Sequence, residues 1–211
     1  PDCNGDLSYD GLEGISVAKN SLTVGAVYDL SDEPAQDRTA VITPFSSWGP
    51  TDDGRIKPDL VANGHQLYSC SDQGVAQYTI LSGTSMAAPA VTGTLALLQE
   101  LYAKSHSGYM RSATLKALAI HTADECGPAP GPDYSYGWGL LNGLAASRII
   151  LTDGEQPMVM QENELHNGGE NKIWISAKGS DPLKITLAWT DPAAFPPDPV
   201  LDPTAPMLIN D

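Results

Sequence analysis

The segment Ser82-Gly83-Thr84-Ser85-Met86-Ala87-Ala88-Pro89 decides the fold, because a short apolar run ends at it and a helical pattern begins there. The apolar run, residues 78–81, is suited to a buried strand. From residue 85 to about 102, leucine and valine recur at helical spacing, and small residues occupy the other faces. Thr84 is the predicted N-cap. Small residues on all sides predict a helix that is closely packed by its neighbours rather than a surface helix.

Two further strands and two further helices are predicted around this strand-to-helix junction. Apolar runs at 22–27 and 60–62 predict buried strands, and the patterns at 112–123 and 141–149 predict helices. Short buried strands that alternate with helices indicate an α/β fold built on a mainly parallel, three-layer sheet. In such sheets a functional site commonly lies where a strand passes into a helix, which directs attention to Ser85.

The pattern changes after residue 152. Apolar residues alternate strictly with polar ones at 183–190, and nearly so at 172–176. A period of two with one polar face is typical of antiparallel strands in a sandwich or barrel. We therefore divide the chain into residues 1–152, the α/β part, and residues 153–211, the beginning of an antiparallel β-sandwich or barrel.

The chain of 211 residues is strongly acidic, with a formal net charge of −15. Such a field repels nucleic acid and anionic membranes, so neither is an expected partner. No apolar run approaches the ~20 residues that cross a bilayer, and the first residues do not resemble a signal peptide. Cys3, Cys70 and Cys126 include no C-x-x-C pair, so no zinc or redox motif is expected. They are compatible with one disulfide and one free thiol, without indicating which two pair.

Ser85 has two of the features that a nucleophilic serine needs. Acyl transfer requires an exposed hydroxyl beside a base, with hydrogen-bond donors directed at the developing oxyanion. At a helix start the N–H of Ser85 has no partner inside the helix, and the dipole favours negative charge by about 0.5–1 kcal/mol. The helix signals alone are better explained by a capped core helix that contains a serine. The Gly-x-Ser-x-Gly motif of α/β-hydrolases is excluded, because Ala87 stands where its second glycine is required.

Five ordered segments together carry a more specific signal. The segment at 83–89 is the most distinctive of them. The other four are residues 22–27, Phe45-Ser46-Ser47-Trp48-Gly49-Pro50, Lys57-Pro58-Asp59-Leu60-Val61-Ala62-Asn63-Gly64 and residues 136–142. In the order in which they occur along the chain, the five segments resemble motifs of the subtilisin-like serine peptidases. The resemblance implies a subtilisin-like catalytic domain, with Ser85 as the acyl-forming nucleophile.

The same resemblance implies the setting in which Ser85 would act. It implies a secreted, extracellular endopeptidase that acts on protein or peptide substrates and uses no cofactor for its chemistry. The strands expected from residue 172 onward resemble the beginning of the β-barrel that is appended to some secreted members.

The sequence departs from this family in three ways. Ala90 stands where the family often has histidine, and Asn63 replaces a usual proline. The third departure is serious, because no Asp-Thr-Gly, Asp-Ser-Gly or His-Gly-Thr segment supplies the aspartate and histidine of a triad. Asn4 lacks the Ala-Gly context of the family's oxyanion asparagine and is interpreted as a turn residue. The histidines, all expected to be surface or loop residues, are His65, His106, His121 and His166.

The triad aspartate and histidine are therefore expected upstream of residue 1, in the missing N-terminal part of the same catalytic domain. That part is the first expected partner of this chain, and without it the chain is predicted to be inactive. The alternative is a non-catalytic member or fragment that binds peptides or serves as a scaffold.

Three secondary expectations concern the surroundings of the site. Met86 is expected to line it, so that oxidation to the sulfoxide would inhibit the enzyme. Residues 11–14 are expected to belong to the wall of the substrate pocket. Structural calcium is expected from the resemblance and the acidity, without assigned ligands. The candidate positions are Asp52, Asp53, Asp59, Asn210 and Asp211.

Overall fold

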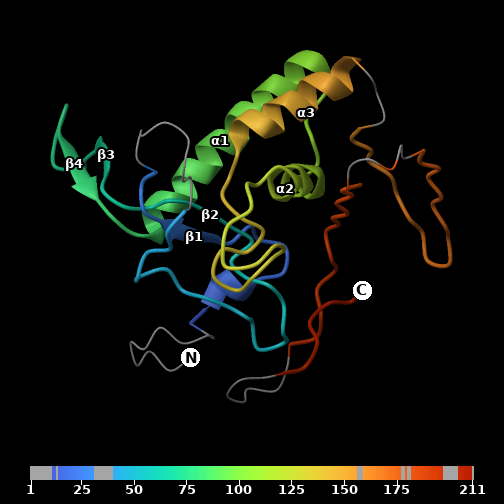
Figure 1. Cartoon of the computed structure of the whole chain (residues 1–211), viewed down its shortest axis with the longest axis horizontal. Helices are drawn as coiled ribbons and strands as arrows, with labels where there is room; N and C mark the ends of the chain where they lie inside the picture. Colours follow the sequence, from blue (N-terminus) through green and yellow to red (C-terminus); the bar gives the residue numbers. More distant parts are fainter. Residues whose placement is uncertain are drawn as a thin grey trace.

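The computed structural model describes residues 11–12, 14–30, 40–155, 159–176, 179, 182–196 and 204–210. Its helices and strands all lie before residue 156 (Figure 1). In chain order they are η1 (Gly14–Val17), β1 (Val24–Val27), β2 (Leu60–Asn63), β3 (Leu67–Cys70), β4 (Tyr78–Leu81), α1 (Thr84–Ser105), α2 (Ser112–His121) and α3 (Gly143–Glu155).

A parallel pair of strands forms the centre of the molecule. β1 pairs with β2 in parallel, with Val24 opposite Leu60 and Val27 opposite Asn63. A parallel bridge between Val61 and Leu140 adds a third segment beside β2. Most residues of both strands are buried, as expected for short apolar strands that are covered on both faces. The predicted strands at 22–27 and 60–62 are thereby confirmed.

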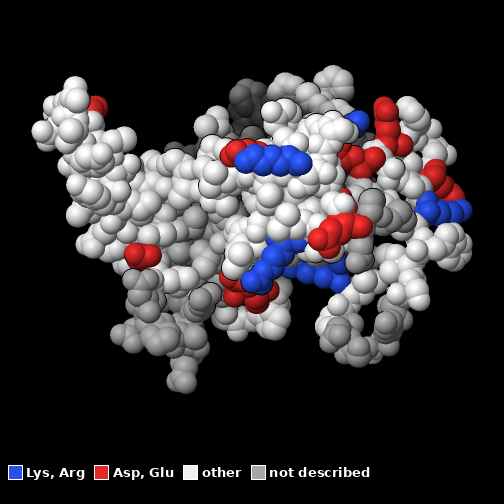
Figure 2. Space-filling model, turned by 90° about the horizontal axis from the view of Figure 1, so that it is seen from above, with Lys and Arg blue, Asp and Glu red and all other residues white. Residues whose placement is uncertain are grey.

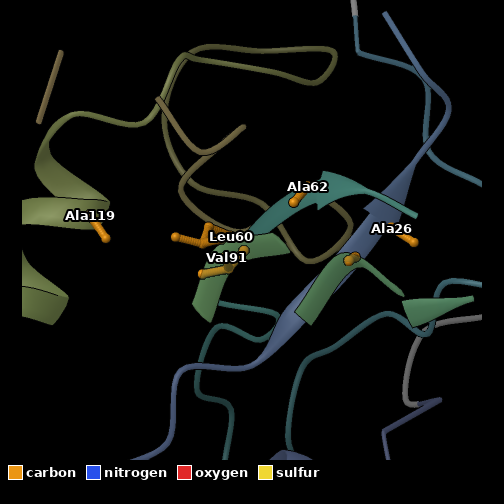
Figure 3. Close-up of a cluster of buried hydrophobic side chains, with 6 residues drawn as sticks. Ala26, Leu60, Ala62, Val91 and Ala119 are labelled. Carbon is orange, nitrogen blue, oxygen red and sulfur yellow. The ribbon is translucent and has the colours of Figure 1, made fainter. Parts of the chain in front are cut away.

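Helix α1 packs against this sheet through small side chains. One core cluster joins the sheet, α1 and α2, and its buried members are Ala26, Leu60, Ala62, Ala87, Val91 and Ala119 (Figure 3). Alanine on both sides of the contact lets the helix approach the strands closely. A second cluster, centred on Leu98, Leu118 and Ile150, joins α1 to α2 and α3. Figure 1 shows α1 and α3 lying side by side above the sheet.

Several predictions of local structure were wrong in detail. The N-cap of α1 is Gly83, and no side chain caps the helix, because Thr84 is already its first helical residue. The strand at 78–81 forms, but it is mostly exposed. It pairs antiparallel with β3, which gives a hairpin that leaves the body of the molecule (Figure 1). The helix predicted at 141–149 begins at Gly143 and continues to Glu155.

One side of α1 is not covered, contrary to the prediction of a helix packed on all sides. We call this side the open side of α1. Its exposed residues are Pro89, Ala90, Gly93, Ala96 and Leu97. Leu97 is 68% exposed, and none of the five is charged, whereas the exposed ion pair of Glu100 and Lys104 follows on the same side further along the helix. Seen from above, the hairpin and the start of α1 carry few charged side chains, whereas charges gather toward the other end of the molecule (Figure 2).

The antiparallel strands predicted at 172–176 and 183–190 are not confirmed. Among the described residues after 158, the chain is extended or turning and pairs in no strand. A strand requires a hydrogen-bonded neighbour, and these two segments find none in the described part of the chain. The apolar residues that alternate along 183–189 are largely exposed. Alternation in the sequence therefore indicates extended backbone here, without a sheet.

Candidate active site

Ser85 lies in the first turn of α1, directly after the hairpin and the turn at Gly83. Ser85 is exposed to solvent. The φ angle of Gly83 is 153°, which residues with a side chain rarely adopt, so glycine is needed for the entry into the helix. Within the described residues, neither the hydroxyl nor the backbone N–H of Ser85 has a hydrogen-bond partner. The first turn therefore offers an accessible hydroxyl next to a free amide donor, at the positive end of the helix dipole.

The turn before Ser85 is fixed by hydrogen bonds to the segment that follows β2. The N–H of Gly83 donates to the carbonyl of Gly64 over 2.8 Å, and the N–H of Gln66 donates to the Ser82 hydroxyl over 2.8 Å. The carbonyl of Gly83 accepts from Met86 over 3.0 Å. The start of α1 is thus held against the end of the parallel sheet, where sites in such sheets commonly lie.

The structure describes Met86 and three of the four residues of the expected pocket wall. The Met86 side chain is half-buried and lies over Gly83, with its sulfur 3.7 Å from where a Cβ on that glycine would be. This places its thioether beside the turn that presents Ser85. Of residues 11–14, Glu13 lies outside the described residues, and Gly11 donates to the carbonyl of Trp48.

No histidine ring in the described part of the chain is bonded to Ser85. His65 packs edge-on against Tyr28, with ring centroids 4.7 Å apart. His106 stacks on Tyr102 and lies 3.1 Å from a carboxylate oxygen of Asp153. None of these contacts involves Ser85. The expected aspartate, histidine and oxyanion asparagine are not brought to the site by the described residues, and Asn4 lies outside them.

The contacts of the other two histidines do not include Ser85 either. A ring nitrogen of His121 lies 2.9 Å from the Thr186 hydroxyl, at the end of α2. Burial and the nearby charge of Lys184 lower the pKa of His121. His166 is exposed.

The candidate calcium positions that the structure describes are occupied by protein contacts. The carboxylate of Asp59 is 2.6 Å from the Lys57 ammonium, in a buried ion pair, and that of Asp53 is 2.8 Å from Arg55. Burial lowers the pKa of Lys57, and the charge of Asp59 partly opposes this shift. Asn210 donates to Asp191, and Asp211 lies outside the described residues. No group of three or more His, Cys, Asp or Glu residues suited to a metal ion occurs in the described ranges.

The thiols that the structure describes are free. Cys70 is exposed on β3, and Cys126 is buried. Burial raises the pKa of the Cys126 thiol, which makes it unreactive at neutral pH. Cys3 lies outside the described residues.

Comparison with known proteins identifies the family. A model described as the subtilase family matches residues 9–139 of this chain. The chain belongs to the subtilase family. The match extends from the region before β1 through Ser85 and α2 to the segment that bridges β2, so it includes every ordered motif except the end of 136–142.

Two relatives and one solved structure illustrate how much of a subtilase this chain covers. The serine protease/ABC transporter B family protein tagA of Dictyostelium discoideum is 31% identical over 186 residues, covering 72% of this chain and 10% of that protein. The C5a peptidase of Streptococcus pyogenes is 49% identical over 90 residues, covering 38% of this chain and 8% of that protein. The structure of the Clostridium perfringens CspB protease matches with a TM-score of 0.54 at 25% identity, covering 68% of this chain and 29% of the other.

The chain therefore spans a tenth or less of the length of these two curated relatives. None of the described helices combines the length and the apolar character that crossing a membrane requires.

Proposed function

We propose that this subtilase chain carries the nucleophile of a serine endopeptidase, and that Ser85 is that nucleophile. The observation that carries the proposal is the position of Ser85, which presents an exposed hydroxyl beside its own free N–H at the start of α1. In the reaction the hydroxyl oxygen attacks the scissile carbonyl carbon, and its proton passes to a histidine base. The N–H of Ser85 donates to the oxyanion, the peptide amine leaves with a proton, and water then hydrolyses the acyl-enzyme.

The histidine and aspartate of this reaction come, in our proposal, from the N-terminal part of the same catalytic domain. Two observations support this partner. No histidine among the described residues is bonded to Ser85, and the open side of α1 begins at Pro89, about one turn after Ser85. Uncharged residues on the exposed side of a helix are typical of a surface that another element covers. The chain alone is therefore proposed to be inactive.

We propose an arrangement of the two parts of the chain on the same basis. Residues 1–152 would complete a three-layer, subtilisin-like sheet together with the missing part, and residues 153–211 would begin an antiparallel β-sandwich or barrel. The buried parallel pair under α1 supports the first statement. The alternating extended segments after residue 158 support the second.

Substrates and setting are proposed from the family. The names of the relatives describe proteases and a peptidase, which supports protein or peptide substrates for this chain as well. We further propose an extracellular location, and structural calcium held by ligands that are not yet assigned. The chemistry proposed for Ser85 needs no cofactor.

A fluorophosphonate probe, which reacts with activated serines, tests the assignment. Ser85 should be labelled in the full-length protein, a Ser85→Ala variant should not be labelled, and the isolated chain should remain unlabelled. Fast, stoichiometric labelling of the isolated chain would contradict the need for a partner. The absence of labelling in the full-length protein would favour a peptide-binding or scaffold role. This is the second candidate because no histidine among the described residues is bonded to Ser85.

A further inference from the structure

A continuous path of backbone hydrogen bonds runs from the end of β1 to the turn that presents Ser85. The N–H of Gly64 donates to the carbonyl of Val27 over 3.1 Å, and the carbonyl of Gly64 accepts from Gly83 over 2.8 Å. The carbonyl of Gly83 then accepts from Met86 over 3.0 Å and from Ala87 over 3.3 Å. Gly64 is therefore the link between the parallel sheet and the start of α1.

The contact at Gly64 leaves no room for a side chain. A Cβ there would lie 2.6 Å from the Cβ of Ala26 on β1, 2.8 Å from the carbonyl oxygen of Gly83 and 3.3 Å from the Cβ of Ala87. Distances below 3.0 Å require an atom to move, and Gly83 contributes a backbone atom rather than the end of a flexible side chain. Any residue larger than glycine at position 64 therefore displaces the turn that leads into Ser85.

We propose that Gly64 is a positioning residue for the nucleophile. Its carbonyl fixes Gly83, and its missing side chain lets the strand end and the helix start approach each other. The inference rests on the proposed role of Ser85, and it adds that the precision of that serine depends on a residue of another element. Displacing a nucleophile by about 1 Å costs on the order of 100-fold in rate, even when the substrate still binds.

The test is Gly64→Ala in the full-length protein, with Gly154→Ala as the matched control. Gly154 lies in α3, away from the open side of α1, is exposed, and an added Cβ there would make only ordinary contacts, the nearest at 3.5 Å from the Cβ of Ser105. We expect Gly64→Ala to lower kcat and the rate of fluorophosphonate labelling by about 100-fold, with KM changed by less than about threefold. Gly154→Ala should leave all three values unchanged.

A second variant separates positioning from packing. Ala26→Gly combined with Gly64→Ala removes the contact between the two Cβ atoms and leaves the contact with the Gly83 carbonyl. We expect the double variant to recover part of the Tm lost in Gly64→Ala while labelling stays slow. If labelling recovers in step with Tm, or if KM rises as much as kcat falls, Gly64 is only a packing residue and the inference is overturned.

Labelling of the wild-type protein distinguishes failure of the nucleophile assignment from failure of the positioning role. If wild-type Ser85 is not labelled, the nucleophile assignment fails, and the positioning role fails with it. If the wild type is labelled and Gly64→Ala is labelled equally fast, only the positioning role fails.

Discussion

The ammonium of Lys19 lies 2.5 Å from a carboxylate oxygen of Asp191, although 172 positions separate the two residues in the sequence. The same ammonium donates to the carbonyls of Pro192, over 2.5 Å, and Met207, over 2.7 Å. The Asp191 carboxylate also accepts from the backbone N–H groups of Ile209 and Asn210, each over 2.9 Å. Both side chains of the pair are largely buried. One ion pair thus ties the C-terminal segment to the loop that leads into β1.

Replacing Lys19 with methionine should release this segment. The variant removes three hydrogen bonds and leaves Asp191 as an unpaired, buried carboxylate. We expect hydrogen exchange at the amides of Ile209 and Asn210 to become faster by roughly tenfold or more. Lys104→Met is the control, because the Lys104–Glu100 pair on α1 is 69% and 60% exposed and such pairs contribute little. Equal exchange in both variants would mean that other contacts hold the segment.

The attachment of the C-terminal segment should persist in mild acid. Burial opposes ionisation of Asp191, but the hydrogen bonds from Lys19, Ile209 and Asn210 outweigh it and hold the pKa of Asp191 well below its usual value. A depressed folded-state pKa gives stability that is complete above the unfolded value, near pH 4, and is lost as the pH falls through the folded value. Protection of the Ile209 amide should therefore change little from pH 7 to pH 4 and decline only below that. Asp191→Asn should lower protection at pH 7 and remove the decline, whereas an unchanged acid profile in this variant would assign the decline to another group.

The open side of α1 can be tested with one leucine. In the isolated chain, Leu97→Ala should change the free energy of unfolding by no more than about 0.5 kcal/mol, because the side chain is 68% exposed. Leu60→Ala should cost about 2–5 kcal/mol in the same chain, because Leu60 is fully buried in the core. If the rest of the domain covers α1, Leu97→Ala should cost about 2 kcal/mol or more in the full-length protein. A small cost there as well would show that nothing packs on Leu97.

Oxidation should act on the enzyme through Met86. Its thioether lies over Gly83, so a sulfoxide oxygen would introduce a polar group beside the turn that presents Ser85. We expect peroxide to remove most of the peptidase activity of the full-length protein, and Met86→Ala to retain its activity under the same treatment. Equal inactivation of both proteins would assign the sensitive position elsewhere.

Much of the fold around Ser85 could be predicted because local signals and packing agree there. The apolar runs that became β1 and β2 are short, bounded by turn residues and buried, and the valine and leucine spacing of α1 matches the side that packs on the sheet and on α2 and α3. The motif at 83–89 singled out Ser85 at the correct helix end. The cap was mispredicted because Gly83 enters the helix with a positive φ angle, which depends on glycine rather than on a side-chain hydrogen bond.

The remaining features depend on contacts between distant parts of the chain, which periodicity does not report. Gly64 is hydrogen-bonded to Val27 and to Gly83, which lie in distant parts of the sequence. Lys19 and Asp191 form an ion pair although their segments share no sequence pattern. The only sequence signal for the contacts of Gly64 was that a glycine follows a predicted strand. The alternation at 183–190 is real, but a sheet also requires a neighbouring strand, which a single segment cannot indicate.

The open side of α1 also affects how this chain would behave before that side is covered. Its residues form an uncharged patch around the half-buried and buried positions of the same helix, and an uncovered apolar patch on a folded protein favours association with other proteins. The chain should therefore associate more readily while that side stays open than after the side is covered. The helix that presents the proposed nucleophile would then also report whether the protease has been assembled.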